Sequence, residues 1–314
     1  MEIIRGLNNL PAQFKSCVLT LGNFDGIHLG HQALIKRLKD VGKNRNLPTA
    51  VMLFEPQPLE FFSANNAQAR LTSFHEKCHF IQQLGIDYVL AIPFNQTFAN
   101  VSAAQFIEHG LIEKLQAQYI VIGDDFRFGA KRQGDAVLLQ HNADHGHFIL
   151  ESLPTYIING QRVSSTAIRQ ALSNDDFPFA SMLLGRPYTI QGRVIHGNKL
   201  ARQLGFPTAN IRLHRKQPAL HGVYFVRVKN QCQNQQYEGI ANIGLRPTIN
   251  GKTAVLEVNI FDFDQNIYGQ YLEVEFVEKI RNEVKFESLA ALQSQIEQDI
   301  CIAKQIRAKL QTTL

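Results

Sequence analysis

The chain has 314 residues, of which 45% are hydrophobic and 19% are charged, and its formal net charge is +5 at pH 7. This length is typical of two domains of ordinary size, and this composition excludes a disordered or fibrous protein. A mild positive charge suits anionic ligands such as nucleotides and does not require a nucleic acid partner.

The four cysteines lie far apart and form no C-x-x-C pair: they are Cys17, Cys78, Cys232 and Cys301. This spacing predicts neither a disulfide scaffold nor a zinc knuckle, and it favours a reducing compartment, the cytoplasm. The N-terminus has no basic start followed by a long apolar run, so we expect no signal peptide. The chain contains no stretch of about 18 apolar residues, so we expect no membrane span.

The first half of the chain alternates short apolar segments with segments of helical periodicity. The expected strands cover residues 17–24, 49–54, 88–94, 118–123 and 147–153. The expected helices cover about 28–45, 73–85, 101–115, 135–145, 164–172 and 177–185. This alternation predicts a Rossmann-like α/β domain, in which helices cover both faces of a parallel sheet.

The second half has closely spaced strands separated by Gly, Asn and Pro, which predicts an antiparallel sheet or a small barrel. The expected strands cover residues 188–197, 222–230, 237–244, 254–263 and 271–280. A terminal helix follows over about 288–310, with an apolar stripe of Leu289, Leu292, Ile296, Ile300 and Ile306. We place the boundary near residue 185, which gives domains of residues 1–185 and 186–314.

The segment GNFDGIHLGH, residues 22–31, is predicted to be a turn from the first strand into the first helix. Gly22 and Gly26 let the backbone approach a phosphate closely, and the start of the helix supplies N–H groups and a positive dipole. Ligands of open parallel sheets bind at such strand ends. The turn is therefore a candidate phosphate site.

The two histidines of this turn, His28 and His31, have the i and i+3 spacing that puts both imidazoles on one helix face, and Gly30 leaves space between them. Both rings can then point at one phosphate chain. The simpler alternative is a pair of ordinary capping and surface histidines. A zinc site with Asp25 is a further alternative, although no additional ligands follow at suitable spacing.

A second segment, SSTAIRQAL, places three hydroxyls at a helix start: Ser164, Ser165 and Thr166. Arg169 follows one turn later. The hydroxyls can simply cap the helix. Beside an arginine, they can also form a clamp for a triphosphate.

The second half has its own candidate site in GRVIHGNKLARQLGFPTANI, residues 192–211. Thr208 and Asn210 are two apart, so in an extended segment both side-chain oxygens face one Mg²⁺ or its phosphates. The preceding residues suit a lid over phosphates: they are Gly192, Gly197, Lys199 and Gly205. A solvated hairpin loop is the alternative.

Two further motifs and one acidic residue have simple structural explanations. NGKTAV, residues 250–255, lacks the first glycine of a Walker loop and precedes a strand, so we expect a hairpin turn. HNADHGH, residues 141–147, is expected to be a solvated turn between a helix and a strand and not a metal site. Glu257 lies among apolar residues of a strand, where it is either an ordinary exposed residue of the alternating pattern or a side chain directed to a site.

The combination of GNFDGIHLGH and SSTAIRQAL resembles the HxGH nucleotidyltransferases. FEPQPLEFF (54–62), GDDFRFGAKRQGD (123–135) and the PTAN region extend the resemblance over the whole chain, to the bacterial bifunctional riboflavin kinase/FAD synthetases. The resemblance implies that the protein phosphorylates riboflavin with ATP to FMN. It also implies that AMP then passes from ATP to FMN, which gives FAD and pyrophosphate.

The resemblance also implies residue roles. In the first domain His28 and His31 would act on the phosphates, and the nucleotide and flavin would contact Gly22, Phe24, Asp25, Gly26, Gly30, Asp125, Phe128, Ser164, Ser165, Thr166 and Arg169. Some family members have Asn at the position of Asp125, so a carboxylate there would have to face a ribose hydroxyl. In the second domain Glu257 would be the general base, and ATP and flavin would contact Gly192, Gly197, Lys199, Gly205, Thr208, Asn210, Arg281 and Phe286, with Thr208 and Asn210 holding Mg²⁺.

Two other functions compete with this interpretation. One is a single-activity adenylyl- or cytidylyltransferase with a structural or partner-binding barrel, against which PTAN and Glu257 argue. The other is an aminoacyl-tRNA synthetase, because HLGH is similar to HIGH; the chain has no K-M-S-K-S and no basic stripe interleaved with aromatics. We therefore expect flavins and ATP as partners, no nucleic acid, no membrane, and a monomer or weak homo-oligomer.

Overall fold

The computed structural model describes residues 1–63, 68–197, 204–215, 217–231, 233, 235–248 and 251–312. Contacts within the chain group it into two compact units. The first unit is Met1–Gln68 with Phe74–Ser165, and the second is Ala69–Ser73 with Thr166–Leu314.

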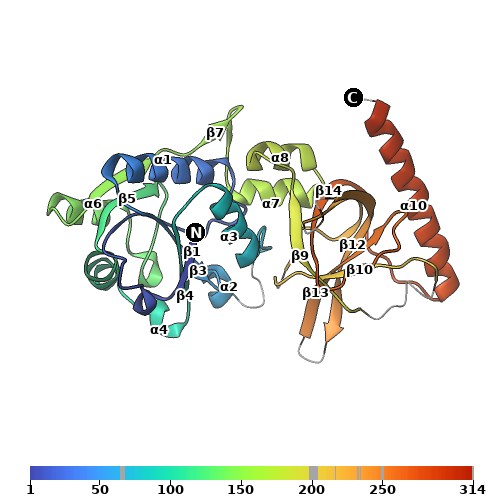
Figure 1. The fold of residues 1–314 in the computed structure, drawn as a ribbon, viewed down its shortest axis with the longest axis horizontal. Helices are drawn as coiled ribbons and strands as arrows, with labels where there is room; N and C mark the ends of the chain where they lie inside the picture. Colours follow the sequence, from blue (N-terminus) through green and yellow to red (C-terminus); the bar gives the residue numbers. More distant parts are fainter. Residues whose placement is uncertain are drawn as a thin grey trace. The chain divides into compact units, whose positions relative to one another are not determined.

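The first unit contains a six-stranded parallel sheet in the order β1-β4-β3-β2-β5-β6 (Figure 1). Its strands are β1 (Glu2–Arg5), β2 (Cys17–Leu21), β3 (Thr49–Glu55), β4 (Tyr88–Pro93), β5 (Ala117–Gly123) and β6 (Ile149–Leu153). The predicted parallel sheet is confirmed. The sequence did not predict β1, a short edge strand that pairs with β4.

Helices cover both faces of this sheet, because the inner strands are apolar on both sides. On one face α1 (Leu29–Arg45) and α3 (Phe74–Gln83) pack against residues such as Val18 and Val51. On the other face η2 (Phe106–Lys114), which is a π-helix, and α6 (Ala136–Asp144) pack against residues such as Leu19 and Met52. The remaining short elements are η1 (Leu7–Asn9), α2 (Pro58–Phe62), α4 (Gln96–Ala99), α5 (Ala103–Gln105), η3 (Ala130–Arg132) and the hairpin of β7 (Ile157–Ile158) and β8 (Gln161–Arg162).

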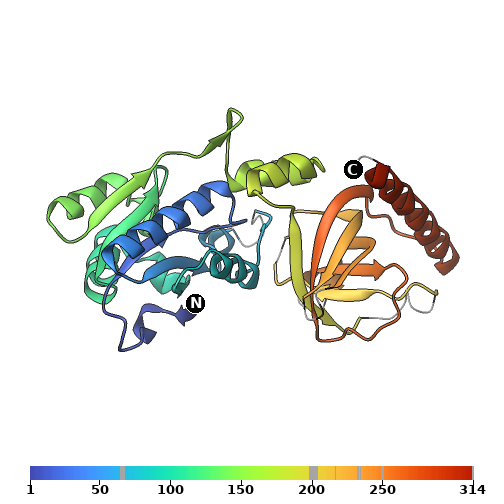
Figure 2. The ribbon, with the colours of Figure 1, turned by 45° about the horizontal axis from the view of Figure 1, so that its top comes forward.

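The second unit contains a closed antiparallel barrel in the order β10-β13-β12-β11-β14-β9, which confirms the predicted barrel. Its strands are β9 (Thr189–Ile195), β10 (Ala209–Arg212), β11 (Gly222–Asn230), β12 (Gln235–Thr248), β13 (Gly251–Ile260) and β14 (Tyr271–Arg281). Its helices are α7 (Ser165–Ser173), whose first residue belongs to the first unit, α8 (Phe177–Leu184) and α10 (Leu289–Thr312). Figure 2 shows α10 running along the outside of the barrel, where Ala303 and Ile306 pack against Val223 and Phe225 of β11.

A short segment from early in the chain, residues 69–73, belongs to the second unit, and we call it the inserted segment. The buried guanidinium of Arg215 donates to the carbonyl oxygen of Leu71 at 2.9 Å, and the hydroxyl of Tyr188 donates to the same oxygen at 3.2 Å. Arg70 forms a parallel bridge with Pro218. The inserted segment is therefore part of the hydrogen-bonded structure of the second unit.

The structure tests the predictions for two motifs that were expected to have no catalytic role, NGKTAV and HNADHGH. Strands β12 and β13 pair with Thr248 opposite Gly251, which confirms the hairpin at the GKT sequence. His141 lies within helix α6 and not in a loop, and the ring of His145 bonds its carbonyl oxygen. In the part of the chain that the structure describes, no group of three His, Cys, Asp or Glu side chains could hold a metal ion.

Candidate active sites

The turn between β2 and α1 has an unusual backbone. Phe24 has φ +46°, Gly26 has φ +86° and Ile27 has φ +43°. Positive φ is costly for non-glycine residues, so surrounding contacts must hold this conformation. Such a concentration of strained residues at a strand end is typical of functional sites.

Three side chains hold the turn by its carbonyl oxygens. Lys77 Nζ donates to Asn23 O at 2.7 Å, Ser165 Oγ to Asp25 O at 2.8 Å, and Gln32 Nε2 to Ile27 O at 2.9 Å. Ser165 was predicted to contact a ligand or to cap α7, and its hydroxyl donates to the turn. Lys77 and Gln32 were not predicted from the sequence. Lys77 lies on the buried face of α3 and is only 1% exposed, and a lysine in such a position is a signal for a positioning role.

The structure brings the two histidines together at the start of α1. Their rings stack with centroids 3.6 Å apart, and Nδ1 of His28 accepts a hydrogen bond from the backbone N–H of His31 at 3.3 Å. A Cβ on Gly30 would lie 3.3 Å from the His28 ring, and a Cβ on Gly22 would lie 3.1 Å from the Phe24 ring. Both glycines therefore make room for rings of the site.

The other residues expected at the first site have varied surroundings. Asp25 is buried in the turn, whereas the side chain of Asp125 is exposed and forms an ion pair with Arg162. Ser164 is half-buried just before α7 and Thr166 is exposed in its first turn. Arg169 belongs to the second unit, and its Nε donates to the carbonyl oxygen of Ala69 at 2.6 Å.

Phe128 lies in the apolar core of the first unit, against Phe106 and stacked on the half-buried Phe126 with centroids 5.6 Å apart. Phe126 therefore presents more surface than the residue that the sequence analysis selected.

An aromatic cluster lies at the carboxyl ends of β3 and β4, and the sequence analysis did not identify it. Neighbouring rings have centroids between 5.3 and 6.2 Å apart, and the cluster consists of Phe54, Phe61, Phe62, Phe94 and Phe98. Phe62 is 63% exposed, so the cluster reaches the surface. Carboxyl ends of parallel strands share one edge, so this apolar wall and the histidine turn lie at the same edge of the sheet.

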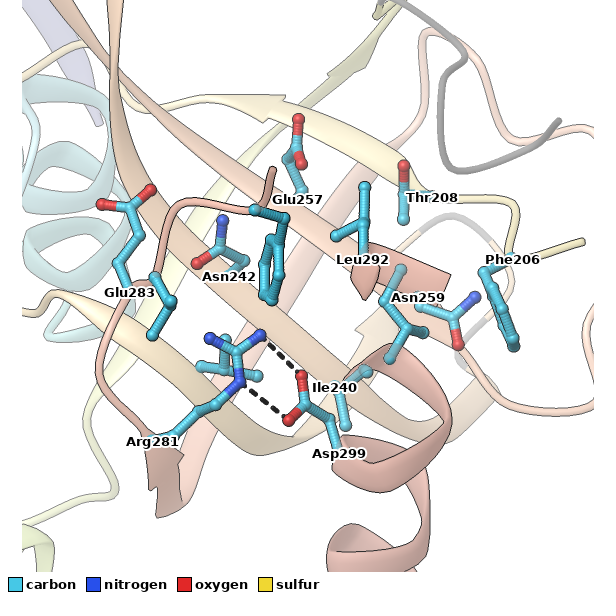
Figure 3. Close-up of a pocket in the computed structure, with 14 residues that line it drawn as sticks. Phe206, Thr208, Ile240, Asn242, Glu257, Asn259, Arg281, Glu283, Leu292 and Asp299 are labelled. Atoms are coloured by element: carbon cyan, nitrogen blue, oxygen red, sulfur yellow. Dashed lines mark hydrogen bonds and ion pairs between the residues drawn. The ribbon is translucent and has the colours of Figure 1, made fainter. Parts of the chain in front are cut away.

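The second unit has a cavity between the outer face of the barrel, α10 and the segment after β14 (Figure 3). Its polar lining includes Thr208, Asn242, Glu257, Asn259 and Arg281. Strand register aligns three of the site's polar residues in one row, because Glu257 of β13 is opposite Asn210 of β10 and opposite Asn242 of β12. Asn242 and Asn259 were not among the residues predicted from the sequence.

The two amides that flank Glu257 share a feature. Oδ1 of Asn210 and Oδ1 of Asn242 are buried and have no hydrogen-bond partner among the described residues. A buried acceptor without a donor costs about 1–3 kcal/mol, so a ligand or ion that satisfies it gains that energy. These oxygens point to a site that is completed by its ligands.

The PTAN segment is positioned by contacts along its length. Nδ2 of Asn259 donates to the carbonyl oxygen of Pro207 at 2.8 Å, just before Thr208. A Cβ on Gly197 would lie 2.4 Å from Cγ of Asn210, so only glycine fits there without moving that amide. Gly205 has φ +90° and nothing near its Cβ position, as expected of a turn glycine.

One residue expected in the phosphate lid is elsewhere. Gly192 lies within strand β9, where a Cβ would meet Cγ2 of Ile211 at 2.5 Å, so it is a glycine for close packing inside the barrel and the prediction was wrong. Lys199 lies outside the described residues.

The floor of the cavity contains an ion pair between the half-buried Arg281 and the buried Asp299 (Figure 3). Arg281, the last residue of β14, donates from Nε and Nη2 to the two carboxylate oxygens of Asp299 on α10, both at 2.8 Å. Its guanidinium carbon lies 5.6 Å from the centroid of the Phe286 ring. Asp299 was not among the residues predicted from the sequence, although an acidic residue within the apolar stripe of α10 is a recognisable signal.

Comparisons with known proteins also distinguish the two halves of the chain. A family model described as FAD synthetase matches residues 10–167, and one described as riboflavin kinase matches residues 184–307. A bifunctional riboflavin kinase/FMN adenylyltransferase from Haemophilus influenzae is 50% identical over 97% of this chain and 98% of its own length. The protein of the same name from Escherichia coli K12 is 46% identical over 97% of each chain.

A solved structure is similar over nearly the whole chain. It is described as a macrolide-efflux protein from Streptococcus pneumoniae, is 31% identical, covers 96% of this chain and 98% of its own, and has a TM-score of 0.75. Among the described residues of the present chain, no helix has the length and apolar character needed to cross a membrane.

Proposed function

The chain belongs to the family of bifunctional riboflavin kinase/FMN adenylyltransferases, and we propose how its residues divide the two reactions. The protein phosphorylates riboflavin with ATP to FMN, and then transfers AMP from ATP to FMN to give FAD and pyrophosphate. The observation that carries this function is the match of one family model to each half of the chain. We assign adenylyl transfer to residues 1–185 and phosphorylation to residues 186–314.

In adenylyl transfer, a phosphate oxygen of FMN attacks the α-phosphorus of ATP, and the bond to the leaving pyrophosphate breaks. No protein nucleophile is required, so the protein contributes positioning and charge stabilisation. His28 and His31 bind the phosphates and stabilise the charge that develops on the pyrophosphate, and the start of α1 adds its N–H groups. Their stacked rings at the end of β2 support this role.

The flavin of FMN requires an apolar surface in the same unit. The aromatic cluster around Phe54 and Phe94 offers one at the same edge of the sheet, and the exposed Phe62 suits contact with a flat ring system. Asp125, which is bonded to Arg162, is available to a ribose hydroxyl. Ser165 contributes by holding the turn, and Arg169 remains our candidate for the terminal phosphates of ATP.

In the kinase reaction, Glu257 accepts the proton of the terminal ribityl hydroxyl while that oxygen attacks the γ-phosphorus of ATP and ADP leaves. The cavity contains Glu257 and Thr208, and strand register puts Asn210 beside the base. Phosphoryl transfer depends mainly on alignment and charge neutralisation, so the base has a supporting role.

We also assign Mg²⁺ to this site. The residues fit the ion: the buried Oδ1 of Asn210 has no donor among the described residues, and the hydroxyl of Thr208 is a second hard oxygen ligand. When bound, Mg²⁺ would neutralise the charge of the nucleotide phosphates. We place the protein in the cytoplasm, which is consistent with the free thiols of Cys17, Cys78 and Cys301.

The test is a pair of incubations of the full chain, resolved by chromatography with fluorescence detection. Riboflavin with ATP and Mg²⁺ should give FMN and then FAD, and supplied FMN with ATP should give FAD and pyrophosphate. A chain that makes FAD from FMN but no FMN from riboflavin would have only the transferase activity. Omitting Mg²⁺ in the presence of a chelator should abolish the kinase reaction.

A further inference from the structure

The ion pair under the kinase cavity uses all three nitrogens of Arg281. Nε and Nη2 are bound to Asp299, and Nη1 donates to the backbone carbonyl oxygen of Asn282 at 3.0 Å. The positive charge is therefore neutralised within the protein. These bonds use three of the five N–H donors of the guanidinium and fix its plane, so in this arrangement Arg281 acts mainly within the protein.

The neighbours of Arg281 indicate what the pair does instead. Its bond to Asn282 fixes the start of the segment after β14, and its guanidinium lies beside the ring of Phe286 at the far end of that segment. Val284 and Phe286 line the cavity from this segment. The orientation of Arg281 thus determines the position of Val284 and Phe286, which form an apolar wall of the cavity.

Asp299 is built to fix that orientation. Its side chain is 2% exposed, it binds the guanidinium in the bidentate geometry that allows one relative orientation, and Nε2 of Gln295 donates to its Oδ1 at 3.0 Å. Helix α10 is anchored by the apolar contacts of Ala303 and Ile306 on the barrel. The carboxylate therefore transmits the position of α10 to the cavity wall.

We propose that Asp299 is a positioning residue of the kinase site, which orients Arg281 and, through it, Phe286 as the wall against the flavin ring system. Asp299 sets the affinity for riboflavin and contributes little to the binding of ATP. This inference rests on the proposed kinase site.

The test separates positioning from simple attachment of the helix. Asp299→Asn should raise the KM for riboflavin about tenfold, as expected for the loss of one well-placed aromatic contact, and leave the KM for ATP unchanged. Riboflavin binding, measured by flavin fluorescence in the full chain, should weaken by the same factor. The matched control is Arg307→Gln, which removes the 2.9 Å ion pair between α10 and Glu238 on the barrel and should leave both KM values unchanged.

A double variant addresses stability. Asp299→Asn leaves a guanidinium without its counter-ion, whereas Arg281→Met with Asp299→Leu replaces the whole pair by apolar side chains and should restore the unfolding temperature. We expect the KM for riboflavin to stay raised in this double variant. If Asp299→Asn does not fold, the KM of the double variant is the measurement that tests the proposal. Recovery of riboflavin affinity together with stability would overturn the proposal, as would an equal effect of Arg307→Gln. A wild-type chain that does not phosphorylate riboflavin would instead contradict the proposed function.

Discussion

The two sites of this chain are made from different parts of the polypeptide. In the first unit the site is a backbone turn in which Phe24, Gly26 and Ile27 have positive φ and side chains hold the carbonyl oxygens. In the second unit the polar row of Asn210 and Glu257 consists of side chains on regular strands, aligned by register alone. The first site should therefore be sensitive to substitutions that loosen its backbone, and the second to the loss of individual side chains.

The largest expected effect tests the side-chain site. Glu257→Gln keeps the shape and removes the proton acceptor, so riboflavin phosphorylation should fall by about 10²–10⁴-fold. Conversion of supplied FMN to FAD should stay nearly unchanged and reports that the chain is folded. Near-normal phosphorylation with saturating Mg·ATP would eliminate Glu257 as the base.

The histidines of the turn come next. His28→Ala or His31→Ala should reduce FAD formation by an amount equivalent to about 2–4 kcal/mol of transition-state stabilisation, because each removes a group directed at the phosphates. FMN formation from riboflavin should be spared. Equal loss of both activities would indicate a folding defect and not a role in the transferase.

A third prediction addresses the backbone of the first site directly. Lys77→Met removes the bond to Asn23 O while keeping the buried aliphatic stem, so FAD formation should fall about tenfold, which corresponds to one lost hydrogen bond to a charged donor. The matched control is Lys43→Met, a lysine in the last turn of α1, which should have no effect. Full transferase activity of the Lys77 variant would contradict the idea that the turn depends on its carbonyl partners.

A fourth prediction concerns the separability of the two units. We expect the fragment 186–314 to phosphorylate riboflavin, but with lower stability than the second unit has in the full chain, because it lacks the inserted segment and helices α7 and α8. Arg215→Met should lower the free energy of unfolding of the full chain by about 1–3 kcal/mol, since it removes a buried hydrogen bond from a charged donor to the carbonyl oxygen of Leu71, which keeps the longer bond from Tyr188. In the fragment, which lacks Leu71, the same substitution should cost less; equal costs by urea denaturation would show that the bond to Leu71 contributes nothing.

The smallest expected effect is chemical. Burial raises the pKa of the Cys17 thiol to about 12. Burial is also the main reason why the pKa of the Cys78 thiol is raised to about 11. Alkylation of the native chain at pH 8 should therefore label the exposed Cys301 and spare both, as checked by peptide mass spectrometry. Both buried thiols should react after denaturation, and rapid labelling of Cys78 in the native chain would show that α3 opens.

The sequence predicted the larger elements because their periodicity and their burial agree. The strands of the parallel sheet are apolar on both sides, and the barrel strands alternate, so both fold classes were correctly predicted. Strand β1 has only four residues, with one buried side chain, and its pairing with β4 depends on tertiary structure. Local patterns carry no information on such an edge strand.

The candidate sites were predictable where local spacing determines geometry. The contact between His28 and His31 is local, because His28 is the N-cap of α1 and its ring accepts a hydrogen bond from the backbone N–H of His31 in the first turn. The pairing of Arg281 with Asp299 instead joins a strand end to the terminal helix. Gly192 illustrates the opposite error, because it was assigned to a lid over phosphates although it lies within strand β9, where the absence of a side chain allows close packing on Ile211. Long-range contacts of this kind cannot be derived from neighbouring residues.

The inserted segment has a consequence for synthesis of the chain on the ribosome. Arg215 is 144 residues downstream of Leu71, whose carbonyl oxygen it binds. At a translation rate of about 5–20 residues per second, the two residues are made on the order of 10 s apart. During that interval the second unit has not been synthesised, so residues 69–73 lack their hydrogen-bond partners. The second unit therefore completes its structure only when it binds this segment, which left the ribosome much earlier.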